Sequence, residues 1–541
     1  MKKKILSLAV AAGLSGVMAG AAHAAMHVND KGLGEALIYP FYSAEGGNDT
    51  YIHVVNTTDY TKAVKVRFIE AHNSAEVLDF NLYLSPHDVW AAAVTIGENG
   101  AAQINTVDTS CTVPDLGQSG AGQHFGTKTE LDNGKILRSQ RFVNHAYVSA
   151  GPTSPGDGGY QGNNRTTQGY VEIIEMGQLD PNDGGFGEAA VHDASGIPND
   201  RANAMAPCAS LVAAWSTVGP NNVWRQEVND EDGTGEATTD LLPWDGEDGG
   251  AAGGLWGYGV VLNVAQGTAV GYDAVAIDDF NYAEEAVPLH FAPGNNLPSL
   301  ENADTVATIF NGSEAVDYVF ATGAEAVSAL FMSSTISNDF VTDPDLNATT
   351  DWVVTMPTKR FFVNQNPAKK PFTKSWSGSQ KACEPVAITH WDREEAFIAP
   401  EDSSGFSPPQ ATGVDNELCT EVSIVQFGDT SPLQAKPGAV DPNGISYPFP
   451  VEYNDGWARM SFLPKDLVGT LPTGSRELVA TSADPSTADL AFVGLPVVGF
   501  ASITYQNLAP VEGSSFGANY SAGVTHKSEQ LITAPTPTPE P

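Results

Sequence analysis

The chain has 541 residues, of which 65 are acidic and 26 basic, and its formal net charge is −39. Its length and its 41% hydrophobic content are sufficient for two or three domains, each with its own core. The negative charge excludes nucleic acid and anionic membrane surfaces as natural partners, because both would be repelled, and it favours cations and saline surroundings.

The first 24 residues predict a secretory signal peptide of bacterial type. Lysines at positions 2–4 precede an apolar run over residues 5–20, and Ala22-His23-Ala24 supplies a small-x-small cleavage signal. An N-terminal membrane anchor is the alternative, but the run is short and rich in Gly and Ala for a spanning helix. We therefore expect an exported chain that begins at Ala25 and has no membrane span.

Residues 36–95 carry the clearest strand pattern. Val64, Val66 and Phe68 alternate with Lys65 and Arg67, and turn residues recur about every ten positions. This spacing is typical of an antiparallel β-sandwich of immunoglobulin-like architecture. Because side chains alternate between the two faces of a strand, we expect Lys65 and Arg67 to face solvent.

Residues 150–255 differ in composition. The segments 151–169, 179–200 and 228–254 predict long surface loops rich in Gly, Asp, Asn and Pro, with a strand expected over 170–176 and a helix over about 202–216. Carboxylates beside glycines in flexible loops are typical calcium ligands. The weak calcium candidates are Asp230, Asp232, Glu236, Asp245 and Asp248. The spacing does not fit an EF-hand, and a solvated acidic loop is the favoured interpretation; no other cofactor is predicted.

The remaining chain predicts further β structure. Residues 258–277 have the pattern of a hairpin with its turn at Gln266-Gly267, and residues 324–334 have helical spacing. The predicted strands of the second half are 352–356, 360–363, 386–391, 421–427, 457–462 and 497–505. The predicted fold class is thus mainly β, with two immunoglobulin-like antiparallel sandwiches, a long loop insertion and short helices. The expected domains are the signal peptide at 1–24, the two sandwiches at 25–299 and 300–528, and a Pro/Thr-rich tail at 529–541.

Four cysteines in an exported chain predict disulfides. Three connectivities are open, and proximity along the chain favours Cys111–Cys208 and Cys383–Cys419, one in each half. In the chain-entropy model each closed loop would stabilise the fold by at most about 4–5 kcal/mol.

No catalytic motif of a familiar type stands in the mature chain. Residues 390–395, His-Trp-Asp-Arg-Glu-Glu, are the densest reactive cluster, but neighbours on a strand face opposite sides, so we expect Trp391 in the core and the charged groups in solvent. Trp244 and Trp256 lie among loop residues and are eligible for stacking on sugars. Capping of the core from loops is the favoured interpretation for both.

Three segments resemble a family of exported bacterial proteins that are described as hypothetical or cell-surface proteins with no assigned activity. They are residues 32–40 (GLGEALIYP), residues 54–59 with 77–86 (VVNTTD and VLDFNLYLSP), and residues 351–359 (DWVVTMPTK). The resemblance implies a surface or extracellular setting and no ligand or site residue.

The sequence favours an exported, disulfide-stabilised, non-enzymatic protein of the cell surface or extracellular matrix, with surface or matrix components as partners. A periplasmic location is the alternative. A module that binds carbohydrate or another extracellular ligand is the second hypothesis, and an enzyme with an unfamiliar site is the third.

Overall fold

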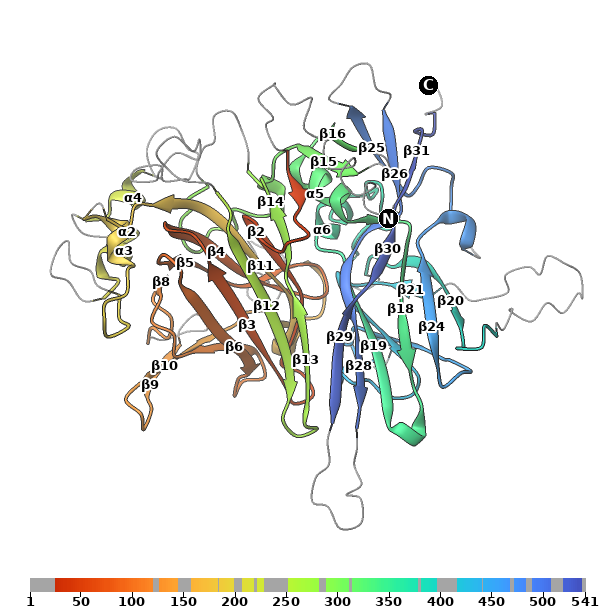
Figure 1. Cartoon of the computed structure of the whole chain (residues 1–541), viewed down its shortest axis with the longest axis horizontal. Helices are drawn as coiled ribbons and strands as arrows, with labels where there is room; N and C mark the ends of the chain where they lie inside the picture. The colour runs from red at the N-terminus through yellow and green to blue at the C-terminus, as the bar shows by residue number, and fades with distance from the viewer. Residues whose placement is uncertain are drawn as a thin grey trace, which may run out of the picture.

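The computed structural model describes residues 25–119, 126–144, 157–182, 184–198, 207–217, 221–227, 252–281, 289–310, 314–377, 381–396, 416–439, 441–467, 471–482, 489–506 and 519–537. Strands dominate this part of the chain and the helices are short, which confirms the expected mainly β fold. Two groups of sheets lie side by side (Figure 1).

The first group consists of two seven-stranded sheets whose pairings are all antiparallel among the described residues. In spatial order, one sheet contains β1 (His27–Val28), β14 (Val275–Asp278), β2 (Ala36–Ser43), β11 (Gln168–Leu179), β4 (Thr61–Glu70), β5 (Glu76–Leu84) and β8 (Cys111–Val113). The other contains β13 (Thr268–Asp273), β12 (Leu255–Asn263), β3 (Asn48–Asn56), β6 (Val89–Ile96), β7 (Ala102–Thr106), β10 (Ile136–Arg141) and β9 (Thr127–Glu130).

These two sheets pack face to face, as the alternation in the sequence predicts. Ile52 and Val54 of β3 are buried in one core cluster with Val64 and Val66 of β4, while Tyr51 of β3 points outward and is exposed. The predicted hairpin is also present, because β12 and β13 pair antiparallel on either side of the turn that contains Gln266 and Gly267. Burial of one face of each strand is the main stabilising term of such a sandwich.

The outer face of the sheet that contains β4 is not solvated. All ten positions of β4 are buried. Short helices α2 (Phe186–Ala189), α3 (Ala209–Ala214) and α4 (Val223–Glu227), together with residues 289–302, cover this face, and Leu211, Trp215 and Trp224 pack on it. The 3-10 turn η3 (Leu300–Asn302) ends the covering segment, and η1 (Asn163–Thr167) precedes β11.

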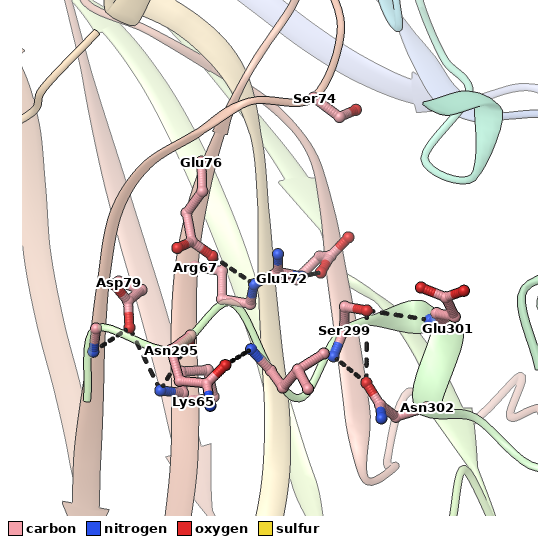
Figure 2. A network of polar contacts seen from close by, with 12 residues as sticks. Lys65, Arg67, Ser74, Glu76, Asp79, Glu172, Asn295, Ser299, Glu301 and Asn302 are labelled. Atoms are coloured by element: carbon pink, nitrogen blue, oxygen red, sulfur yellow. Dashed lines mark hydrogen bonds and ion pairs between the residues drawn. The ribbon is translucent and has the colours of Figure 1, made fainter. Parts of the chain in front are cut away.

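The expectation that Lys65 and Arg67 face solvent is therefore wrong. Both side chains are buried beneath the covering segment: Lys65 donates to Asp79 and to the carbonyl of Ala292, and Arg67 binds Glu76 and Glu172 (Figure 2). The alternation places them correctly on the opposite face from Val64 and Val66. Residues more than 200 positions further along the chain then cover that face.

The second group contains two five-stranded sheets. One contains β21 (Asn416–Leu418), β20 (Glu384–Trp391), β24 (Asp455–Ser461), β18 (Thr335–Val341) and β30 (Lys527–Glu529). The other contains β23 (Ser446–Phe449), β22 (Val422–Phe427), β19 (Ala348–Thr355), β28 (Val498–Tyr505) and β29 (Tyr520–Thr525), and its β22–β23 pair is parallel. Phe340, Trp352 and Met460 belong to the core cluster that joins the two sheets.

A third five-stranded sheet and several short elements accompany these two sheets. A five-stranded sheet contains β15 (Val306–Phe310), β16 (Ala315–Val319), β25 (Glu477–Ser482), β26 (Leu490–Val493) and β31 (Leu531–Thr533), and β17 (Met332–Ser333) pairs with β27 (Leu495–Pro496). Two 3-10 turns, η4 (Pro344–Leu346) and η5 (Pro464–Asp466), lie in connections. The predicted helix is α5 (Gly323–Phe331), which the Thr322 side chain caps by accepting from the Glu325 amide.

The strand predicted at 360–363 is wrong, because these residues lie in a short helix, α6 (Lys359–Val363). The chain leaves β19 at Thr355 and turns, which lets Phe362 and Val363 enter the second core while Arg360 reaches the carbonyl of Ser74 in the first group. Aromatic and branched residues favour strands, but this long-range packing overrides the local preference.

A seam of direct contacts joins the two groups of sheets. Tyr170 donates its hydroxyl to the Pro357 carbonyl at 3.1 Å, and the Val422 amide donates to the Ala71 carbonyl at 3.0 Å. The larger core cluster is continuous across this seam and includes Val353 of the second group.

Both disulfides have the favoured pairing, Cys111–Cys208 and Cys383–Cys419. The first ties the helical cover to β8, where Cys208 directly precedes α3, and the second joins the start of β20 to the segment that leads into β22. Of the helices in the described ranges, none has the length and apolar character needed to cross a membrane.

Candidate functional site

One cleft lies between the two groups of sheets. Its volume is about 900 Å³. Residues from β1, β12, β13 and β14 form one wall, and residues from β28, β29 and β30 form the other. The apolar part of the lining contains Leu330, Phe331, Met332, Val497, Val498 and Phe500. Clefts between packed units are the preferred location of ligand sites.

An aromatic stack stands at this cleft. Trp256 lines it and is 38% exposed. The rings of Trp256 and Tyr258 are stacked with centroids 6.0 Å apart, and Tyr258 in turn stacks on His53 of the neighbouring strand at 4.5 Å. The expectation that Trp256 caps the core from a loop is wrong, because Trp256 lies on β12, on its outward face.

Close backbone packing fixes the position of this stack. Gly257, between the two stacked aromatic residues of β12, faces the opposite way, and a Cβ there would lie 1.9 Å from the Tyr39 hydroxyl oxygen. That hydroxyl donates to the His53 carbonyl at 2.7 Å. Only glycine leaves room for this hydrogen bond. The strand that carries Trp256 is therefore held tightly against the facing sheet, which contains Tyr39 on β2.

The polar side chains of the cleft differ in whether they are available to a ligand. Asp30, Lys31 and Asp273 line the cleft and are exposed. His526 also lines it, but its Nε2 donates to the Val353 carbonyl at 2.9 Å and its Nδ1 accepts from the Asn338 side chain at 3.1 Å. Burial lowers the pKa of His526 to about 4, against a smaller opposing effect of the Val353 carbonyl. His526 is therefore a neutral structural group.

A second aromatic pair lies on the other group of sheets. Trp391 of β20 and Trp457 of β24 are directly opposite in the register, and their rings stack at 4.3 Å. Arg459 lies over the Trp391 ring at 5.7 Å, and Trp457 is 40% exposed. The expectation that Trp391 enters the core is wrong, because its ring belongs to the outer face of this sheet.

The other members of the cluster at 390–395 are dispersed. His390 binds Glu452 at 2.8 Å and Arg393 binds Asp455 at 2.9 Å. Glu394 and Glu395 lie exposed in the turn that follows β20. The structure thus brings Trp391 and Trp457 together. Glu394 and Glu395 do not lie on a strand and do not form an acid–base pair.

The seam contains a buried group of charged side chains that no sequence pattern indicated. Arg165 binds Glu70 at 2.8 Å and Asp157 at 2.5 Å. Across the seam Glu421 is fully buried beside Lys359, and burial is the main cause that raises the pKa of Glu421 and lowers that of Lys359, both to about 8. Of these groups, Arg165 is paired with carboxylates within the fold, which offsets the cost of burying its charge.

A smaller cleft of about 490 Å³ contains the carboxylates of Glu76, Asp79 and Asp115. Carboxylates that converge from separate elements are the signature of a hydrolase site. Here each is bound to a cation: Glu76 to Arg67, Asp79 to Lys65, and Asp115 to Lys128. Glu76 and Asp79 belong to the buried ion-pair network of Figure 2, which fits a structural role for both carboxylates.

Carboxylates also gather near the start of the described chain. The Glu35 carboxylate accepts from the Asn281 amide, and the carboxylates of Glu175, Asp278 and Asp279 are close enough to act on it. Burial first, and then repulsion by these neighbours, raises the pKa of Glu35 to about 8. A proton on Glu35 relieves this repulsion.

The calcium candidates Asp230, Asp232, Glu236, Asp245 and Asp248, together with Trp244, lie outside the described residues. Among the residues that are described, one group has metal-like spacing, Cys383, Glu417 and Cys419. Its two sulfurs form a disulfide with each other, so no thiolate is present to bind a metal ion.

No family model, curated protein or solved structure matches this chain.

Proposed function

We propose that this chain is an exported, non-enzymatic protein of the cell surface or extracellular matrix, with a structural or adhesive role. The observation that carries the proposal is the seam. Tyr170, Arg360 and Val422 make direct contacts across it, so the two groups of sheets form one continuous body. A body of this kind resists extension and presents its outer faces at a fixed spacing.

The two disulfides support the same proposal. Each closes a long stretch of chain, because the sequence separation is 97 for Cys111 and Cys208 and 36 for Cys383 and Cys419. Covalent links of this kind persist in oxidising compartments and protect a protein that is exposed outside the cell. The signal-peptide pattern of residues 1–24 and the net charge of −39 are consistent with a soluble body in saline surroundings.

Cell fractionation combined with protease shaving tests the location. We expect the chain to be exported and the mature protein to begin at Ala25. Protease added to intact cells should degrade it, while a periplasmic marker stays intact. Protection of the chain in intact cells would place it in the periplasm and remove the surface role.

A deletion strain tests the role itself. We expect reduced attachment to surfaces or an altered composition of the extracellular matrix, restored by the wild-type gene. Unchanged attachment and unchanged matrix composition would contradict the proposal.

A ligand-binding module for carbohydrate is the second candidate, and one observation favours it. The stacked rings of Trp256, Tyr258 and His53 stand beside the cleft of about 900 Å³ between the two groups of sheets.

A further inference from the structure

The wall of the large cleft contains a rigid aromatic surface of the kind that binds sugars. Sugar rings present C–H groups that pack on the negative face of an aromatic ring, and indole offers the largest such face. Trp256 is partly exposed and is supported along its strand by the Tyr258–His53 stack. Because the ring is already held in place, little conformational freedom is lost when a ligand packs against it.

The same cleft offers polar groups on both walls. Asp273 lies on the wall that carries Trp256, and Ser528 and Gln530 lie on the opposite wall, all with exposed side chains. Sugar hydroxyls both donate and accept hydrogen bonds, so they need carboxylates, hydroxyls and amides together. The apolar lining at Phe331 and Val498 matches the C–H faces of the same ligand.

The charges of the cleft and of the whole chain indicate which class of sugar can bind. The exposed ionic groups of the cleft include two carboxylates, Asp30 and Asp273, and one cation, Lys31. The whole chain carries a net charge of −39, so an acidic polysaccharide would be repelled as it approached. A neutral glycan has no such barrier.

We propose that the cleft between the two groups of sheets binds a neutral polysaccharide, with Trp256 as the stacking platform and Asp273 as a hydrogen-bonding partner. This inference rests on the second candidate function, a carbohydrate-binding module, and adds the class of ligand and its location. The surface role does not depend on it.

The test is affinity electrophoresis and calorimetry of the full mature chain with soluble neutral polysaccharides, namely dextran, laminarin, xyloglucan and galactomannan, and with alginate as an acidic comparison. We expect binding to at least one neutral polysaccharide and none to alginate. Trp256→Ala should weaken binding at least tenfold, and Trp256→Phe, which keeps a ring, should retain most of it. Asp273→Ala should also weaken binding, although it leaves Trp256 in place. This second variant tests the site even if Trp256→Ala does not fold.

Trp457→Ala is the matched control, because Trp457 is as exposed as Trp256 and also belongs to a stacked pair, but lies outside this cleft. We expect it to bind like the wild type. The inference is overturned if none of the four neutral polysaccharides binds, or if Trp457→Ala loses binding while Trp256→Ala keeps it. In either case protease shaving still reports independently on the surface role.

Discussion

Gly523 of β29 lies directly against Gly271 of β13, where the edges of the two groups of sheets meet (Figure 1). A Cβ on Gly523 would lie 2.0 Å from the Gly271 carbonyl oxygen, whereas a Cβ on Gly271 would find its nearest neighbour at 4.0 Å. Two glycines in contact therefore have opposite tolerance for a side chain.

Gly523→Ala should loosen this edge contact. The added methyl meets backbone that can yield only if the strands separate, so we expect a loss of about 1–2 kcal/mol in the free energy of unfolding, measured by urea titration. Gly271→Ala is the matched control and should change stability by less than about 0.5 kcal/mol or raise it slightly, because alanine restricts the unfolded chain. Equal effects of the two substitutions would contradict the close approach.

Arg67→Ala should be strongly destabilising. It leaves the carboxylates of Glu76 and Glu172 buried without their cation, and breaking a buried ion pair typically costs about 3–5 kcal/mol. Arg393→Ala is the control, because its pair with Asp455 is largely exposed and should contribute about 0–1 kcal/mol. Urea titration of both variants measures the contrast, and a loss below about 1 kcal/mol for Arg67→Ala would indicate that Arg67 is solvated.

The loss of stability on removal of each disulfide should increase with the length of chain that the disulfide closes. Replacing Cys111 and Cys208 together by serine should lower the free energy of unfolding by about 2–5 kcal/mol. The Cys383–Cys419 pair spans 36 residues against 97, so its removal should cost about 1 kcal/mol less in the chain-entropy model. Denaturant midpoints of the two double variants test the order, and the reverse order would show that local strain or packing outweighs chain entropy.

Glu35 should make stability depend on pH. Its pKa is 4.5 in its ordinary state and about 8 in the fold, so the folded protein binds the extra proton between these values. Its contribution to stability is therefore complete below about pH 4.5 and is lost as the pH rises to about 8, with a slope of at most about 1.4 kcal/mol per pH unit.

Glu35→Gln keeps the shape of the protonated side chain and cannot ionise. We expect this variant to lose less stability than the wild type between pH 5 and pH 8, measured by denaturant midpoints at both values. Glu394→Gln, at an exposed position, should follow the wild type. An unchanged pH dependence in Glu35→Gln would mean that Glu35 is ionised in the folded protein.

The candidate site was only partly accessible to sequence reasoning. The sequence indicates Trp256 as eligible for stacking on sugars but does not by itself point to Tyr258 and His53. The usable signal is the aromatic residue two positions after Trp256, at the start of a predicted strand. The opposite wall comes from β28–β30, about 240 residues or more further along the chain, and no local pattern indicates which distant segment will face a given strand.

The sequence by itself determined the mainly β class, the hairpin at Gln266-Gly267, the inward direction of Val64, Val66 and Phe68, and the favoured disulfide pairing. These follow from the period of two along a strand, from turn chemistry and from separation along the chain, all of which are local. Only the tertiary structure decided what covers each face. It buried Lys65 and Arg67, turned residues 359–363 into a helix and set Trp391 outside the core, because long-range burial and pairing of charges outweigh local preference.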